Sequence, residues 1–300
     1  MVRSRVTYLS GWVVFRVSTQ TIAGRCSRES VSPPAGTLAM YLRLFPSSTD
    51  PLYTYTCLGA FLGSLGIYEV LSPWVSRRVT SCYERLPRAQ QFEWNNKITA
   101  TINDVLCTVF TMYAMFFDDK LRYDDLRSDS HWCKLAGAII LGYFIADILE
   151  MFWRPKIKWD TSMFLHHLAA AIMTYVTLFW YSFAQFYGTI LMMMEASSPF
   201  LNIRNLLLLA GWSKSSRPYT SVSALFVITF FVFRVAIIPP FWYAVIHQIR
   251  VNPDVHLPEF RVGRDVGLLT AIVLNALNVY WFTFILAKTK RKLFPLKHKE

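Results

Sequence analysis

The chain has 300 residues, of which 54% are hydrophobic and 17% charged, and its mean hydropathy is +0.31. Several apolar runs reach the length of about 20 residues that a bilayer-crossing helix needs, which argues against a soluble protein. The net charge of +12 fits basic loops that face anionic lipid headgroups. No groove-reading motif accompanies this charge. We therefore expect a polytopic membrane protein that does not bind nucleic acid.

The first fifty residues differ in composition from the rest of the chain. Residues 1–50 contain six arginines against two acidic residues, are rich in Ser and Thr, and have no strong apolar run. This composition is shared by mitochondrial transit peptides and by disordered tails, and both interpretations stay open. We predict an N-terminal segment over 1–50, a transmembrane domain over 51–292, and a basic cytosolic tail over 293–300.

The apolar runs and the charges between them predict an all-α fold, a transmembrane bundle of about seven helices with six to eight as the range. The gap at 182–184 predicts a tight hairpin between the fourth and fifth helices. The expected helices span residues 54–75, 98–117, 135–153, 162–181, 185–208, 221–247 and 265–287.

The loop cations predict the orientation of these helices in the membrane. With seven spans, sixteen Lys and Arg fall on the side that includes the C-terminal tail, and seven fall on the other side if the first fifty residues are left aside. Cytosolic loops carry the excess of basic residues. We therefore expect the C-terminus to lie in the cytosol.

The cysteines and histidines do not form the spacings of a metal site. The five cysteines are scattered without a CxxC pair, and the six histidines are too few and too dispersed for a di-iron centre. We expect neither a metal nor a resident cofactor.

Ionisable groups at membrane depth cost several kcal/mol unless they are paired or hydrated, so each is a candidate for function. Near the midplane, Glu195 and Arg234 have opposite charges and are expected to pair. Pro199 is expected to kink its helix and to free the carbonyl of Glu195. The candidates for a polar lipid cavity or for structural contacts are Asn103, Asp104, Glu195, Ser198, Pro199, Asn202 and Arg234.

The adjacent histidines His166 and His167 are the strongest catalytic candidates, with Asp147 as the carboxylate that orients one of them. Histidine titrates near neutrality and acts as base, acid or nucleophile when it is held in place. Neighbouring helix positions diverge by about 100°, so the two rings are expected to face different partners. The alternative is that these polar groups only join helices, each bond contributing about 1 kcal/mol.

Five stretches in order resemble the TLC-domain family, which includes ceramide synthases, TRAM proteins and smaller TLC domain-containing proteins. They are EWNNKITATIND at 93–104, GYFIADILEMFWR at 142–154, FLHHLAAAIM at 164–173, MEASSPFLNIRNL at 194–206 and FFVFRVAIIPPFW at 230–242. The resemblance implies a membrane protein of the endoplasmic reticulum that acts on lipids. The chain departs from the pattern at Asn103, where the small branch carries a histidine, and at Glu195 and Ser198, where the synthases carry an acidic motif.

Three functions follow from the residues and the resemblance. The first is a factor of lipid homeostasis that binds a lipid or acyl chain in an intramembrane cavity lined by polar residues. The second is a ceramide-synthase-like N-acyltransferase, with acyl-CoA as co-substrate, a sphingoid base as acceptor, and His166, His167 and Asp147 as its catalytic residues. The third is an accessory of secretory cargo or translocation. The sequence does not define an oligomeric state.

Overall fold

The computed structural model describes residues 50–153 and 160–293, and all regular elements within these ranges are helical. The helices form seven consecutive passes. These are α2 (Pro51–Gly66) with η1 (Ile67–Leu71) and α3 (Ser72–Val79); α5 (Arg88–Phe117) after the short α4 (Cys82–Arg85); α6 (His131–Trp153); α7 (Thr161–Thr174) with η2 (Tyr175–Trp180); α8 (Gln185–Met193) with η3 (Met194–Ser197) and α9 (Ser198–Leu209); α10 (Arg217–Phe230) with η4 (Phe231–Val235) and α11 (Ile238–Val251); and α12 (Arg261–Leu293), preceded by η5 (Pro253–His256) and η6 (Pro258–Phe260).

Local sequence signals set where several passes begin. The Asp50 carboxylate accepts a hydrogen bond from the backbone N–H of Leu52 at the start of α2, and Asp160 accepts from Ser162 and Met163 at the start of α7. An N-cap carboxylate satisfies backbone donors that have no partner in the first helical turn. Proline at position 51 suits the first turn because the N–H that it lacks would be unpaired there.

All seven predicted helices are present, and the bundle fold is confirmed. Six passes are long and apolar enough to cross a membrane. The fifth, Gln185–Leu209, is helical but more polar, because it contains Glu195 and Asn202, and it packs against α5 inside the bundle. The second pass begins at Arg88, ten residues before the predicted start at 98. In that stretch Asn95 is buried and accepts from Ser72 of α3, and Asn96 donates to Asp147 of α6.

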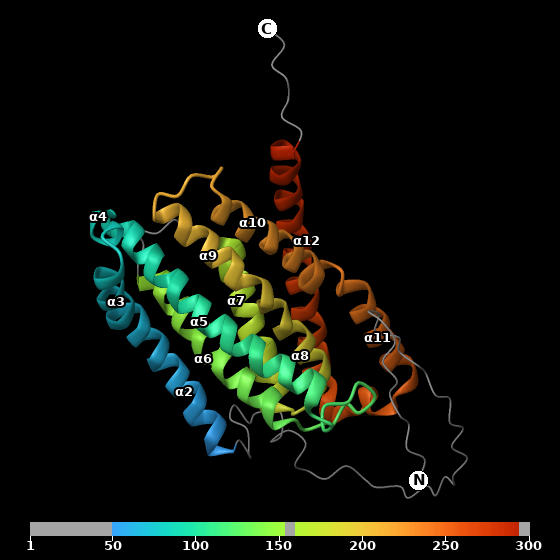
Figure 1. The fold of residues 1–300 in the computed structure, drawn as a ribbon. Coiled ribbons are helices and arrows are strands. Elements are labelled where there is room, and N and C mark those ends of the chain that lie inside the picture. The colour runs from blue at the N-terminus through green and yellow to red at the C-terminus, as the bar shows by residue number, and fades with distance from the viewer. Residues whose placement is uncertain (1–49, 154–159, 294–300) are drawn as a thin grey trace, which may run out of the picture. The chain divides into compact units, whose positions relative to one another are not determined.

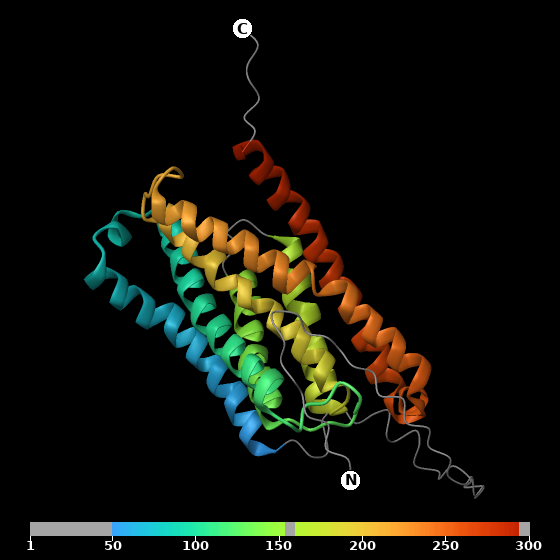
Figure 2. The ribbon, with the colours of Figure 1, turned by 45° about the vertical axis from the view of Figure 1, so that its right-hand side comes forward.

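Successive passes run in alternating directions, so the loops gather at two ends of the bundle (Figures 1 and 2). We call the end that carries residues 118–130, 181–184 and 252–260 the hairpin end. The tail end carries residues 80–87, 210–216 and the end of α12. The same two groups of loops were separated by charge in the sequence. The predicted loop cations at 154–158 lie outside the described residues, as do residues 1–49 and 294–300.

The first and third passes pack with their backbones in close approach. A Cβ placed on Gly142 of α6 would lie 2.3 Å from the carbonyl oxygen of Cys57 and 2.8 Å from the backbone nitrogen of Phe61, both in α2. Small residues at membrane helix interfaces permit this approach, which increases van der Waals contact. The outer face of α2 is open instead, since a Cβ on Gly63 would meet nothing within 4 Å.

Helix irregularities coincide with the charged residues of the interior. Glu195 lies in the 3-10 segment η3, and Arg234 lies in the π-helical segment η4. Pro199 has no N–H to donate to the Glu195 carbonyl, and the backbone N–H of Ser198 donates to it instead. Pro199 therefore interrupts the regular helix as a tightened 3-10 turn, and the carbonyl of Glu195 is bonded there instead of free. The pair Pro239–Pro240 follows η4 at the start of α11, where the chain turns before continuing as a helix.

The loops of the hairpin end are joined by polar and aromatic contacts. The Arg127 guanidinium donates to Asp254 at 3.0 Å and to Glu259 at 2.9 Å, and it lies over the ring of Phe260. The pKa of Arg127 is raised, most of all by the hydrogen bond to Asp254 and next by the one to Glu259. Phe260 stacks on Phe183 with ring centroids 4.4 Å apart. These contacts connect the second, fourth and sixth interhelical loops.

The predicted hairpin at 182–184 is present and has a constrained backbone. Ser182 and Ala184 have φ values of 47° and 59°, in the left-handed region that non-glycine residues rarely adopt. The Ala184 N–H donates to the carbonyl of Leu126 at 2.7 Å. That hydrogen bond to a neighbouring loop holds the unusual conformation.

Candidate functional site

The two adjacent histidines face different carboxylates. Nδ1 of His167 lies 2.7 Å from Asp147 Oδ2, close enough for an ion pair although without the alignment of a regular hydrogen bond. Nε2 of His166 lies 3.2 Å from Glu195 Oε1. Asn96 donates to the other oxygen of Asp147 at 2.6 Å. The 100° between neighbouring helix positions thus gives each imidazole its own acidic partner.

Glu195 and Arg234 form the pair expected from their opposite charges and depth. Nη2 of Arg234 lies 2.9 Å from Glu195 Oε2, and both side chains are more than nine-tenths buried. Ser198 donates to the same carboxylate oxygen at 2.6 Å. The guanidinium also donates to Ser197 through Nε at 2.8 Å, to Ser198 through Nη2 at 2.8 Å, and to Asn278 through Nη1 at 3.0 Å. This network joins the fourth, fifth, sixth and seventh passes.

The second pass supplies two further polar contacts that point in different directions. Asp104 accepts a hydrogen bond from Asn202 of α9 at 3.1 Å. Asn103 instead donates to Ser64 of α2 at 3.1 Å and to the carbonyl of Thr99. Asn103 therefore lies away from the histidine pair and connects the second pass to the first.

Taken together, the polar residues predicted from sequence bond mainly to one another. Asn202 shares a helix face with Glu195 and Ser198 in the sequence, yet it pairs with α5 while the other two pair with Arg234. Hydrogen-bonded partners lower the cost of placing polar groups at membrane depth. The polar core thus holds the passes together, and of the residues expected to line a lipid cavity only Glu195 borders either of the two cavities described below.

Aromatic rings cover both imidazoles. Phe144 stacks on His167 with centroids 4.8 Å apart, and Trp281 lies against His166 at 5.3 Å. Each histidine is 5% exposed. A small pocket of about 10 Å³ borders His166, Glu195 and Thr174, which is room for about one water-sized group. The imidazoles therefore have acid–base partners but little room for a substrate in this conformation.

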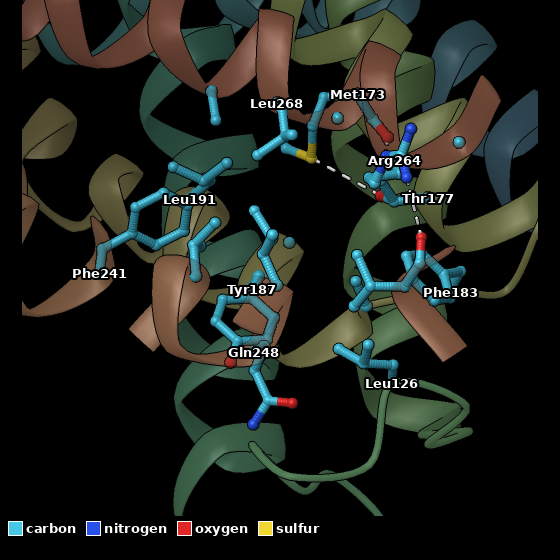
Figure 3. A pocket seen from close by; sticks show the side chains of 18 residues that line it. Leu126, Met173, Thr177, Phe183, Tyr187, Leu191, Phe241, Gln248, Arg264 and Leu268 are labelled. Atoms are coloured by element: carbon cyan, nitrogen blue, oxygen red, sulfur yellow. Dashed lines mark hydrogen bonds between the residues drawn. The ribbon is translucent and has the colours of Figure 1, made fainter. Parts of the chain in front are cut away.

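A larger cavity of about 80 Å³ lies nearer the hairpin end, between the fourth, fifth, sixth and seventh passes (Figure 3). Its lining is almost entirely apolar and includes Leu126, Phe183, Tyr187, Phe241, Val245 and Leu268. Met173 and Leu191 line both this cavity and the small pocket beside His166. The two spaces are thus neighbours, separated by these two side chains.

Asn96 and the apolar cavity are features of the site that were not singled out from the sequence. Asn96 was missed because the predicted second helix began at 98, which left this residue outside the span. Its position two turns before Asp104 was the available signal. The apolar cavity gave no signal at all, because its lining residues come from separate passes and resemble ordinary core positions.

The helical bundle and its buried polar network define an integral membrane protein, and the chain belongs to the TLC-domain family. The family model for the TLC domain matches residues 93–287, which contain every residue of the polar network except Ser64. The family resemblance seen in the five sequence stretches is thereby confirmed.

Several TLC-domain proteins are similar to this chain over most of its length. TLC domain-containing protein 4-B of Xenopus laevis is 28% identical over 216 residues, 72% of this chain and 81% of its own length. Human TLC domain-containing protein 4 is 27% identical over 239 residues, 78% of this chain and 88% of its own length. Protein CLN8 of Canis lupus familiaris is 25% identical over 245 residues, covering 80% and 81%.

Proposed function

We propose that this protein serves lipid homeostasis by holding a lipid hydrocarbon chain inside its helical bundle. The observation that supports this most directly is the apolar cavity beside the polar core. A water-sized group needs about 10–15 Å³ of such a volume, and a methylene is of similar size. A cavity of about 80 Å³ therefore has room for about five to eight methylenes, a substantial part of one acyl chain.

In this proposal the protein resides in the endoplasmic reticulum membrane with its tail end in the cytosol. The excess of basic residues at the tail end supports that orientation. Acceptor sites for N-glycosylation inserted after residue 122 and after residue 213 test it. Glycosylation of the first alone is expected, and glycosylation of the second alone would reverse the assignment.

Lipid mass spectrometry of the purified protein tests chain binding, and the structure offers a matched pair of variants. Gly267 lines the cavity, and a Cβ there meets only Thr177 Cγ2 at 3.6 Å, an ordinary contact. The Gly267→Leu side chain is expected to fill the cavity and displace the lipid. Gly63→Leu adds the same group on the open face of α2 and should leave the bound lipid unchanged.

The outcome separates a specific cavity ligand from lipid that only surrounds the protein. Loss of one lipid species in Gly267→Leu, with the same species retained in Gly63→Leu, is the expected result. Equal lipid profiles for the wild type and both variants would overturn the proposal, provided that all three proteins elute as monodisperse peaks.

A second candidate is N-acyl transfer from acyl-CoA to a sphingoid base, favoured by the two histidine–carboxylate pairs. Nδ1 of His167 lies 2.7 Å from Asp147, a carboxylate that could orient this ring as a general base, and either ring could take an acyl group. Purified protein in defined lipid would be assayed with long-chain acyl-CoA and sphingoid base. Ceramide formation no greater than that of the His166→Ala, His167→Ala double variant would exclude this reaction.

A third candidate is an accessory of secretory cargo, which none of the contacts or cavities of the described residues specifically favours. Affinity capture of secretory clients that depends on the loops and not on the histidines would support it.

A further inference from the structure

Among the described residues that line the cavity, one has a charged side chain, Arg264 near the start of α12. Its Nε donates to Asp265 at 2.8 Å, and its Nη1 donates to the backbone carbonyl of Val255 at 3.1 Å. These bonds fix the guanidinium at the hairpin end of the cavity, beside Thr177 and opposite Phe241 (Figure 3). The side chain keeps 24% of its surface exposed, and its Nη2 donates to none of the residues that the structure describes.

A hydrocarbon chain alone gives the cavity little means of selecting its ligand. Within a membrane, the chain leaves an equally apolar surrounding when it enters the protein, so apolar transfer contributes little to its affinity. Selectivity among single-chain lipids must then come from a polar group. Arginine is well suited to this role because its guanidinium binds carboxylate or phosphate oxygens through two parallel hydrogen bonds.

The opposite end of the cavity does not suit an acidic headgroup. There, across the cavity from Arg264 and Thr177, Leu191 and Phe241 present apolar side chains that offer an anion no partner (Figure 3). The adjoining pocket of about 10 Å³ is also too small for a carboxylate or phosphate. Along α12 the cavity lining runs from Arg264 to Ala271, seven residues on, which at 1.5 Å per residue is about 10 Å. That distance accommodates an extended chain.

We infer that the cavity binds a single-chain lipid with an acidic headgroup, whose carboxylate or phosphate pairs with Arg264 while its chain extends toward Leu191 and Phe241. This inference rests on the proposed chain binding and adds the chemical class and direction of the ligand. The headgroup stays at the hairpin end, near the membrane interface, where an anion is least costly.

Three probes of equal chain length test the role of the headgroup: dodecanoate, dodecyl phosphate and dodecanol. Their dissociation constants are measured by competition against a dansyl-labelled fatty acid on the full chain in a neutral detergent. We expect at least one acidic probe to bind at least tenfold more tightly than dodecanol. The two acidic probes also distinguish a carboxylate ligand from a phosphate ligand by their relative affinities.

The variants separate a specific pairing from general attraction to positive charge. Arg264→Gln is expected to reduce the preference for the acidic probe to less than threefold while dodecanol binds as before, which also shows that the cavity is intact. Arg264→Lys should keep an intermediate preference. Arg261→Gln removes an exposed cation one turn away and should change nothing, since Arg261 does not line the cavity.

The outcomes also distinguish this inference from the proposed function on which it rests. Unchanged preference for the acidic probe in Arg264→Gln, or an equal loss in Arg261→Gln, would overturn the inference and leave chain binding in place. If Gly267→Leu binds all three probes as tightly as the wild type, the cavity is not the binding site and both proposals fail.

Discussion

Arg234 stabilises the bundle because it neutralises Glu195 and bonds to several passes at once. Arg234→Met keeps much of the side-chain volume and removes the charge and all four hydrogen bonds. In membrane proteins such bonds average about 0.6 kcal/mol each, so their loss alone accounts for about 2–3 kcal/mol. The Glu195 carboxylate is then left buried without a cation, and breaking a buried pair in this way costs about 3–5 kcal/mol. We therefore expect Arg234→Met to lower the free energy of unfolding by about 3–5 kcal/mol.

Removing both charges should restore much of the stability, since the dominant cost is the unpaired carboxylate. In the double variant Glu195→Gln, Arg234→Met, the new amide can still bond to His166 and Ser198. We expect the free energy of unfolding of this double variant to exceed that of the Arg234→Met single variant by about 2 kcal/mol or more. The free energy of unfolding is measured by titration with sodium dodecyl sulfate in mixed micelles, followed by tryptophan fluorescence.

Arg204 provides the control for this comparison. It lies over the ring of Tyr219 at 5.2 Å and bonds to the neighbouring Asn205. Arg204→Met should cost about 1 kcal/mol or less, as expected of a partly exposed cation–π contact. An Arg234→Met variant no less stable than Arg204→Met, or a double variant as unstable as the single one, would refute the charge argument.

Three further predictions follow from the packing and the loops. Gly142→Ala places a Cβ against the backbone of α2 and should lower the free energy of unfolding by about 1–3 kcal/mol through overpacking. The control Gly63→Ala should change it by no more than about 0.5 kcal/mol. Equal free energies of unfolding for the two variants would contradict the close approach. Asp147→Asn removes a buried charge beside the His167 imidazole and should lower the free energy of unfolding by about 1–3 kcal/mol, measured by the same detergent titration. An unchanged free energy of unfolding would mean that this ion pair does not stabilise the protein. Arg127→Gln should speed hydrogen exchange over residues 252–260 without moving the global unfolding midpoint, because exposed ion pairs act locally; unchanged exchange would show that the loop contacts do not depend on this arginine.

The seven helices could be predicted from sequence because a membrane imposes a simple rule. Each pass needs about 20 apolar residues, and its backbone must satisfy its own hydrogen bonds. The boundaries were harder to predict. The second pass begins at Arg88 because polar residues such as Asn95 and Asn96 find partners in other helices, and hydropathy along one chain segment does not report such partners.

The polar residues of the interior were also visible in the sequence, since charged side chains are rare at membrane depth. Depth and charge were enough to predict that Glu195 pairs with Arg234, and helix geometry was enough to predict that His166 and His167 face different partners. The specific partners required coordinates. Asn103 and Asp104 are neighbours in the chain, yet the first bonds to α2 and the second to α9.

The sequence by itself determined the helical bundle, the alternation of its ends and the residues that must avoid the lipid, because each follows from the cost of polar groups in hydrocarbon. Only the tertiary structure decided how these residues pair, and it placed the larger cavity among apolar side chains instead of beside the histidines. The physical reason is that apolar contacts have no direction and no sequence period that marks an unfilled space. A cavity arises from the combined shapes of four passes, and Arg264 becomes part of it only when those passes are assembled.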